Sequence, residues 1–211
     1  MAITDKNLET KGILLVLSSP SGAGKSTLSK LLRNDLNLYV SVSATTRLPR
    51  GSEENGVDYY FLTKEKFEEE ISAGHFAEYA QVHGNYYGTY KKIIYDSVEH
   101  GYDLLFDIDY KGMLQLKQQM PLDVVSVFIL PPSMDKLSER LCNRSEDSES
   151  EIVRRLITAR EEIKQCVNYD YVLVNNTVED SYNKLKNIYM AEKLKRERAS
   201  SLNDFISELL A

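Results

Sequence analysis

Short apolar runs recur along this chain, and the stretches between them have the spacing of amphipathic helices. The runs cover residues 13–17, 104–108, 124–130 and 171–174. Such runs are typical of strands buried on both faces of a parallel sheet, with helices as crossovers. Directly after the first run, leucines follow helical spacing at Leu28, Leu31, Leu32 and Leu36. The chain is therefore predicted to open with a strand, a tight loop and a helix, within an α/β fold.

The stretch from Val40 to Ser97 differs because it concentrates tyrosines and glycines, and we interpret it as an inserted, partly β subdomain. Further on, residues 145–151 read Ser-Glu-Asp-Ser-Glu-Ser-Glu, with no apolar anchor before a helix resumes at Ile152. This acidic segment suits either a mobile lid or a solvated surface loop.

The last forty residues have a helical pattern that ends in one apolar stripe. The stripe consists of Leu202, Phe205, Ile206, Leu209 and Leu210. It must be covered, either by the chain's own core or by a second copy in a homo-oligomer. The basic residues between Lys193 and Arg198 are interrupted by Glu197 and preceded by Glu192, which favours a solvated helix face over a nucleic-acid patch.

Composition narrows the class of protein. The 211 residues suffice for one sizeable core, and 26 Lys plus Arg against 32 Asp plus Glu give a net charge of −6. That balance provides no general attraction to nucleic acid or to an anionic membrane. Cys142 and Cys166 form no metal-binding pattern, and no run is long enough to span a bilayer, so we expect a cytoplasmic protein.

A phosphate-binding loop is predicted between the first strand and the first helix. Residues 19–26 read Ser-Pro-Ser-Gly-Ala-Gly-Lys-Ser, in the context that such a loop requires. Gly22 and Gly24 let backbone N–H groups surround phosphate oxygens, Lys25 can reach the β and γ phosphates, and Ser26 can ligate Mg²⁺. The first glycine of the usual pattern is Ser19 here, and an ordinary strand-to-helix turn is the alternative. The predicted ATP site comprises Ser19, Pro20, Ser21, Gly22, Ala23, Gly24, Lys25, Ser26 and Thr27.

A carboxylate ends the apolar run at 104–107, and Asp107 could thus stand near Mg²⁺ and its water shell. The following residues, Asp109 to Gly112, also fit the D-x-x-G of a GTPase switch. However, the only near match to the base-reading N-K-x-D is residues 183–186, which end in lysine within an evident helix.

Residues 45–62 resemble the signature of guanylate kinases. They contain Thr-Thr-Arg at 45–47, then Arg50, Glu53, Gly56 and Tyr-Tyr-Phe at 59–61. Residues 78–89 resemble the second nucleotide-contact segment of the same family, and the likeness extends over nearly the whole chain.

The chemistry of these residues is consistent with a GMP site. Arg47 and Arg50 can bind a phosphate dianion through their planar donors, and Tyr59 and Tyr87 can add neutral hydroxyl donors. Glu78 can accept from guanine N1–H and its 2-amino group at once, whereas adenine presents an acceptor at N1. A mispaired buried polar group of this kind rejects the wrong base.

Further site residues rest on the resemblance alone. It implies that Ser43 and Thr89 face the guanine, with Thr89 donating to O6, and that Asp107 and Asp109 lie on the GMP side. It also implies that Arg140 and Arg144 of a lid, with Arg155 from the next helix, neutralise the transferred phosphoryl group together with Lys25 and Arg47. Lys111 and Ser145 depart from residues common in the family.

The resemblance implies a three-layer P-loop kinase fold with a mainly parallel five-stranded sheet. Within one domain, 1–211, it implies a core (1–42, 98–133 and 161–211), a GMP-binding α+β subdomain (43–97) and a lid (134–160). The implied reaction is transfer of the γ-phosphoryl group of ATP to GMP, and to dGMP, with Mg²⁺ held by Ser26 and, through water, Asp107. A non-catalytic interaction module of the same fold and a GTPase switch are the alternatives.

Overall fold

The computed structural model describes residues 8–36, 38–82, 84–144 and 148–211. Its main sheet has five parallel strands in the order β2-β7-β1-β8-β9. The four apolar runs form β1 (Leu14–Ser18), β7 (Leu104–Asp107), β8 (Val124–Leu130) and β9 (Tyr171–Val174), as predicted. The fifth strand, β2 (Tyr39–Val40), is an exposed edge of two residues, so no apolar run marks it.

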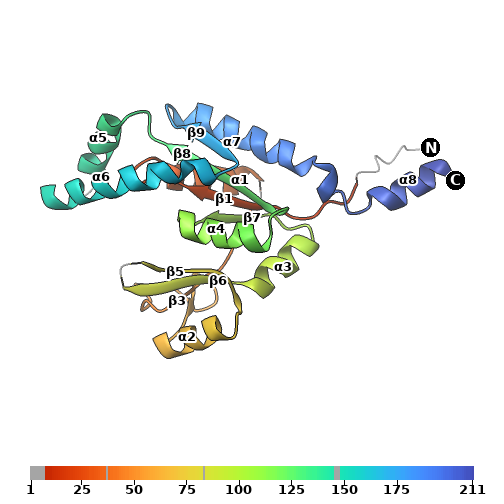
Figure 1. Ribbon diagram of the computed structural model, residues 1–211, viewed down its shortest axis with the longest axis horizontal. Coiled ribbons are helices and arrows are strands. Elements are labelled where there is room, and N and C mark those ends of the chain that lie inside the picture. The colour runs from red at the N-terminus through yellow and green to blue at the C-terminus, as the bar shows by residue number, and fades with distance from the viewer. Residues whose placement is uncertain (1–7, 37, 83, 145–147) are drawn as a thin grey trace.

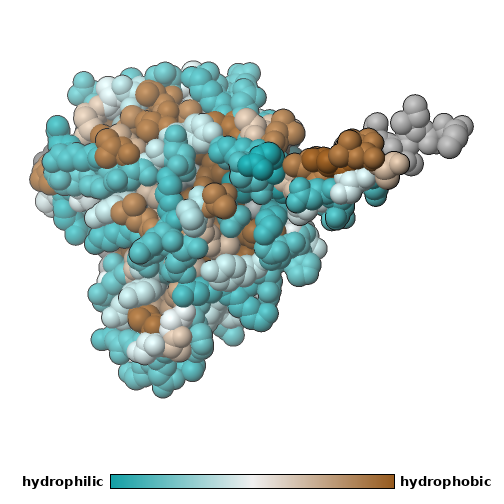
Figure 2. All heavy atoms as spheres, turned by 45° about the vertical axis from the view of Figure 1, so that its right-hand side comes forward, coloured by the Kyte–Doolittle hydropathy of each residue, from teal (hydrophilic) through white to brown (hydrophobic). Residues whose placement is uncertain are grey.

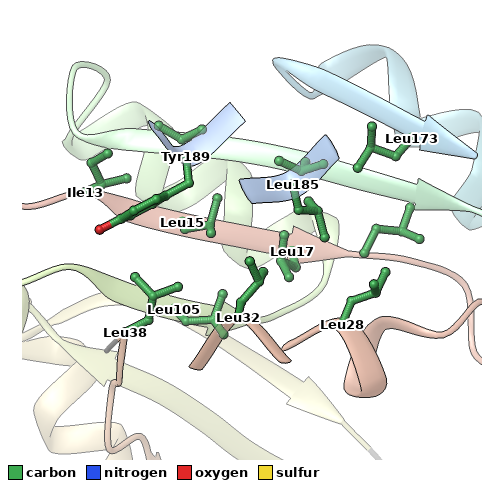
Figure 3. Packing of buried hydrophobic residues seen from close by; sticks show 13 residues of the cluster. Ile13, Leu15, Leu17, Leu28, Leu32, Leu38, Leu105, Leu173, Leu185 and Tyr189 are labelled. Atoms are coloured by element: carbon green, nitrogen blue, oxygen red, sulfur yellow. The ribbon is translucent and has the colours of Figure 1, made fainter. Parts of the chain in front are cut away.

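Alternate residues of β1 enter two hydrophobic cores on opposite faces of the sheet. Ile13, Leu15 and Leu17 pack with α1 (Lys25–Leu36) and α7 (Val178–Lys193), through residues such as Leu28 and Leu185 (Figure 3). Leu14 and Val16 pack on the other face with α3 (Lys91–Glu99) and α4 (Tyr110–Gln119). The predicted three-layer α/β architecture is confirmed (Figure 1).

The tyrosine-rich insertion forms a second sheet of four strands. Its order is β4-β3-β6-β5, comprising β3 (Ala44–Thr45), β4 (Tyr60–Phe61), β5 (Phe76–Val82) and β6 (Asn85–Tyr90). From α2 (Lys64–Ser72), Phe67 stacks on Phe76 and Tyr86, with ring centroids 4.4 and 5.2 Å apart. This confirms a partly β subdomain. Its predicted end at residue 97 falls inside α3, where Ile94 and Val98 already belong to the main core.

Two helices form a hairpin beside the main sheet, seen at the left of Figure 1. They are α5 (Met134–Arg144) and α6 (Glu149–Lys164), which a 3₁₀ turn, η1 (Gln165–Asn168), follows. Leu137, Leu141 and Ala159 give the hairpin its own small core. Ser148 caps α6, so this helix begins before Ile152, and it continues past the predicted lid boundary at residue 160. Residues 145–147 lie outside the described part of the chain.

The C-terminal stripe is not docked on the chain's own core. In α8 (Leu202–Leu210) no residue is buried, and Leu209 and Leu210 are 68% and 83% exposed. The helix extends from the body as an arm whose apolar side is visible in Figure 2. The basic tract before it is also not a uniformly solvated helix face, because Arg198 in η2 (Arg196–Arg198) is buried beside Glu192.

Cys142 and Cys166 are both free thiols. None of the helices in the described ranges has the length and hydropathy of a membrane span.

Candidate active site

The predicted phosphate loop connects the end of β1 to the start of α1. Gly22 and Gly24 have φ angles of +87° and +101°, which residues with a Cβ rarely adopt. The Ala23 N–H donates to the Pro20 carbonyl at 3.1 Å and closes the turn. Because α1 begins at Lys25 with no acidic residue in its first turn, its unpaired N–H groups and dipole favour an anion here. The loop is thus suited to phosphate although Ser19 replaces its first glycine.

Asn175, which the sequence reasoning missed, anchors this loop to β9. The buried side chain donates from Nδ2 to the Ala23 carbonyl at 2.7 Å and accepts from the Ser181 hydroxyl at 2.9 Å. A Cβ on Gly24 would lie 2.4 Å from Nδ2, so the close approach requires glycine. The available signal was the position of Asn175 directly after an apolar run, where ligand-binding residues of parallel sheets gather.

Lys25 and Asp107 come together as the parallel pairing of β1 and β7 requires. Leu17 pairs with Asp107, and the Lys25 ammonium forms an ion pair with the Asp107 carboxylate. Ser26 and Thr27 are exposed in the first turn of α1, on the open side of the loop. The carboxylate predicted to face Mg²⁺ is therefore adjacent to the lysine predicted to face phosphate.

A separate cavity of about 270 Å³ lies between the second sheet and the ends of the main strands. Its lining includes Ser43, Tyr59, Glu78, Tyr87, Asp107 and Asp109. Thr89 donates to Glu78 Oε1 at 2.7 Å, and the Ser43 and Thr89 hydroxyl oxygens are 3.3 Å apart. In this structure the Thr89 hydroxyl, which we expected to donate to guanine O6, therefore donates to Glu78 instead.

Glu78 is a buried carboxyl group with 4% of its surface exposed. Loss of hydration on burial raises its pKa to about 7, and the negative charge of Asp109 adds to this effect, whereas the Thr89 hydrogen bond opposes it. The other oxygen of Glu78 faces the first turn of α4, which Asp109 caps by accepting from the Gly112 N–H at 2.9 Å. A carboxyl held in this way is suited to reading hydrogen-bond donors of a ligand.

Arg47 is positioned by the two threonines before it. Thr45 donates to the Tyr86 carbonyl at 2.9 Å, and Thr46 accepts from the Tyr86 N–H at 2.9 Å, which ties this segment to β6. The Arg47 guanidinium then makes two bonds of 2.9 Å to Glu53 and lies 5.3 Å from the centroid of the Tyr59 ring.

Glu53 changes what Arg47 can offer to a ligand. At least three of the five guanidinium N–H donors are engaged, two by Glu53 and one by the Leu48 carbonyl, and Tyr87 is a further hydrogen-bond partner. Glu53 holds the pKa of Arg47 above its usual range, and Arg47 holds that of Glu53 below it. Arg50 is exposed, and its backbone N–H donates to Glu53 at 2.7 Å. The bidentate contact expected with a phosphate dianion is therefore available from the Arg50 side chain. Arg47 keeps only some of its guanidinium N–H donors for a ligand.

The two predicted lid arginines whose side chains the structure describes, Arg140 and Arg155, both contact groups of the protein itself. Arg140 donates to the Ala23 carbonyl at 3.3 Å and to the Asn175 carbonyl at 3.5 Å, and it lines a cavity together with Gly22, Gly24, Ser26 and Thr27 of the loop. Arg155 pairs with Glu151 at 3.5 Å on its own helix. Arg144 ends α5, and its side chain lies outside the described residues.

Glu162 is a second residue that the sequence analysis did not assign to the site. It lines a cavity of about 140 Å³ together with Ser19, Lys25 and Asp109. Burial raises the pKa of Glu162, with an opposing contribution from Lys25. A third carboxylate therefore faces the space between the loop and the base cavity.

Comparison with known proteins identifies the family that the chain resembles. The family model described as guanylate kinase matches residues 11–192. The guanylate kinase of Bartonella henselae is 49% identical over 206 residues, 98% of this chain and 93% of the relative. That of Ehrlichia ruminantium is 45% identical over 204 residues, 96% of this chain and 97% of the relative. The crystal structure of guanylate kinase from Anaplasma phagocytophilum matches with a TM-score of 0.74 and 38% identity, covering 95% of this chain and 96% of that one.

Proposed function

This chain belongs to the guanylate kinase family, and from that premise we propose how its cleft transfers the γ-phosphoryl group of ATP to GMP. One observation carries the proposal. Asp107, Ile108 and Asp109 line both the cavity beside Glu78 and the cavity beside Lys25. A base bound at the first cavity and a phosphate bound at the second would therefore occupy one continuous cleft.

Guanine is proposed to bind with its N1–H and 2-amino group on the Glu78 carboxylate, beside Ser43 and Thr89. The 5′-phosphate is then bound by Arg47, Arg50, Tyr59 and Tyr87. Support comes from the edge-on packing of Tyr87 against Tyr59, at 6.1 Å, which joins the arginine cluster to the base cavity. These contacts involve base and phosphate only, so dGMP is expected to be a substrate as well.

ATP is proposed to bind with its phosphates on residues 19–27. Mg²⁺ prefers oxygen ligands, keeps several waters, and binds one or two carboxylates together with substrate phosphates. The Ser26 hydroxyl and Asp107 carboxylate fit that donor set. No group of three or more metal-ligating side chains occurs in the described parts of the chain, which is consistent with a metal that binds together with the nucleotide. The metal would help to neutralise phosphate charge.

The rest of the catalytic effect is proposed to come from the residues that hold the phosphates. The GMP phosphate is already ionised, so no strong base is needed, and the rate depends on in-line positioning and charge neutralisation. Arg140, Arg144 and Arg155 are proposed to supply positive charge after the α5–α6 hairpin closes. The ion pair between Arg155 and Glu151 would then have to open. Closure would also exclude water and limit hydrolysis of ATP.

The test is ADP release from Mg·ATP with GMP, dGMP, AMP, CMP and UMP offered separately. We expect GMP and dGMP to exceed the other three by at least about 100-fold in kcat/KM, because mispaired buried polar groups discriminate strongly. Binding of ATP without turnover of any monophosphate would favour the non-catalytic module instead. The GTPase alternative has lost support, because residues 183–186 lie within α7 and Leu185 is in the core.

We further infer that the stripe on α8 contacts a second copy of the chain. The stripe is uncovered among the described residues, and backbone bonds between residues 9–11 and 198–200 secure the base of the arm. Leu209→Glu is expected to halve the mass measured by sedimentation equilibrium, because it buries a charge in the contact. Ser207→Glu, at an exposed position of α8 farther from the stripe, is the matched control and should leave the mass unchanged. A parent protein that sediments as a monomer would contradict the inference.

We also propose a cytoplasmic location, which the two free thiols fit. A nucleic-acid partner remains unexpected from the net charge of −6.

A further inference from the structure

The first turn of α4 lies directly against the carboxylate proposed to read guanine. A Cβ placed on Gly112 would be 2.9 Å from Glu78 Oε2 and 3.2 Å from Ile108 Cδ1. Side-chain carbons essentially never approach other heavy atoms closer than 3.0 Å, so either the carboxylate or the helix would have to move. Gly112 is itself buried, so a methyl group there could not turn toward solvent.

The backbone does not explain why residue 112 is glycine. Gly112 lies within a regular helix and is not one of the glycines with a positive φ angle. In a helix, glycine is less favourable than alanine because it loses more conformational freedom on folding. Only the space that a side chain would occupy accounts for glycine at this position.

The Glu78 carboxylate is the part that would yield. The α4 helix is fixed by the Asp109 cap and by Met113 and Leu116, which are fully buried in the main core. The carboxylate, in contrast, is the end of a side chain, and its known fixed point is the 2.7 Å bond from Thr89 to Oε1. A methyl group on residue 112 would therefore turn Oε2 away from its present position while Oε1 stays bonded.

We propose that Gly112 is a specificity-determining positioning residue, whose missing side chain lets both oxygens of Glu78 face the guanine N1–H and 2-amino group. The inference rests on the proposed role of Glu78 and adds a cause for the orientation of its carboxylate. It assigns Gly112 no contact with either nucleotide, and its effect reaches the substrate only through Glu78.

Gly112→Ala is expected to raise the KM for GMP about 3- to 10-fold, since Oε2 must move by a few tenths of an ångström and a misplacement of roughly 1 Å costs about 100-fold. The KM for ATP should stay within about twofold, and the melting temperature should not fall, because alanine favours helix. Gln118→Ala, at an exposed position of the same helix, is the matched control and should change neither KM. An unchanged KM for GMP in Gly112→Ala would overturn the inference.

The Glu78→Ala variant is used as a second genetic background, which tests the role of Gly112 separately from the proposed role of Glu78. In Glu78→Ala there is no carboxylate to displace, so adding Gly112→Ala should leave the KM for GMP where Glu78→Ala alone puts it. A further rise in the double variant, or a parallel loss of ATP affinity, would assign Gly112 a general structural role instead. If Glu78→Gln leaves the preference for GMP over AMP unchanged, the proposed role of Glu78 in reading guanine is refuted, whatever the effect of Gly112→Ala.

Discussion

Replacement of Lys25 by alanine is expected to lower kcat about 100- to 1,000-fold while the fold is kept. The ammonium group stands at the end of the phosphate loop, where charge develops on the transferred phosphoryl oxygens, and one such donor typically accounts for this range. Stability should change little, because the ion-pair partner, Asp107, is half-exposed, and exposed pairs contribute only about 0–1 kcal/mol. Steady-state kinetics with saturating ATP and GMP, together with thermal unfolding, measure both effects.

Lys186→Ala provides a matched control. Lys186 of α7 likewise forms an ion pair with a carboxylate, Asp35 at 2.6 Å, but at the other end of α1. Ten residues of helix place Asp35 about 15 Å from Lys25. We expect kcat to be unchanged in this variant. A kcat for Lys25→Ala within a few-fold of the parent would refute the assignment of residues 19–27 to the ATP phosphates.

Glu78→Gln is expected to reduce the preference for GMP over AMP about 10- to 100-fold. The amide can accept only one guanine proton and places its own donor against the other, and a buried mismatch of this kind costs about 1–3 kcal/mol. The preference is measured as the ratio of the two kcat/KM values. Glu192→Gln is the control, because Glu192 is equally buried but lines a different cavity. Its ratio should match that of the parent.

The same carboxyl group predicts a pH dependence. Burial raises the pKa of Glu78 to about 7 in the free protein, so the group gains a proton as the pH falls through this value. The protonated form has one donor and can no longer accept both guanine protons, so kcat/KM for GMP should fall from pH 8 to pH 6. The protonated form can donate to adenine N1, so the preference for GMP over AMP should also become smaller between pH 8 and pH 6.

Glu78→Gln separates this titration from that of the nucleotide. The second phosphate pKa lies near 6, and its contribution persists in the variant, whereas the step near pH 7 should vanish. An identical pH profile in the parent and in Glu78→Gln would show that Glu78 does not titrate in the free enzyme.

Much of the main sheet could be predicted because buried strands leave a local mark. The three inner strands β7, β1 and β8 and the edge strand β9 are each an apolar run, and the helix after β1 repeats its leucines at helical spacing. The two-residue edge strand β2 leaves no such mark, because both of its side chains are exposed. The pattern also does not mark where the insertion gives way to the main core, since Ile94 and Val98 of α3 pack in the main core although α3 follows the second sheet directly.

The site shows the same division between local and distant features. The loop at 19–27 and the segment from Thr45 to Tyr59 were visible because their residues are close together in sequence. Asn175 was not, since it reaches Ala23 across 152 positions and carries no local motif. Glu162 was not assigned to the site, because a helical pattern identifies a face and does not say what lies opposite.

The sequence by itself determined the α/β class, the phosphate loop, the family and the candidate chemistry, because these depend on residue types at short spacing. Only the tertiary structure decided which oxygens and cations meet: Lys25 with Asp107, Arg47 with Glu53, and Glu78 with the first turn of α4. It also showed α8 extending from the body, where the pattern allowed it to be docked. Contacts between distant segments depend on how whole elements pack, and no local spacing encodes that packing.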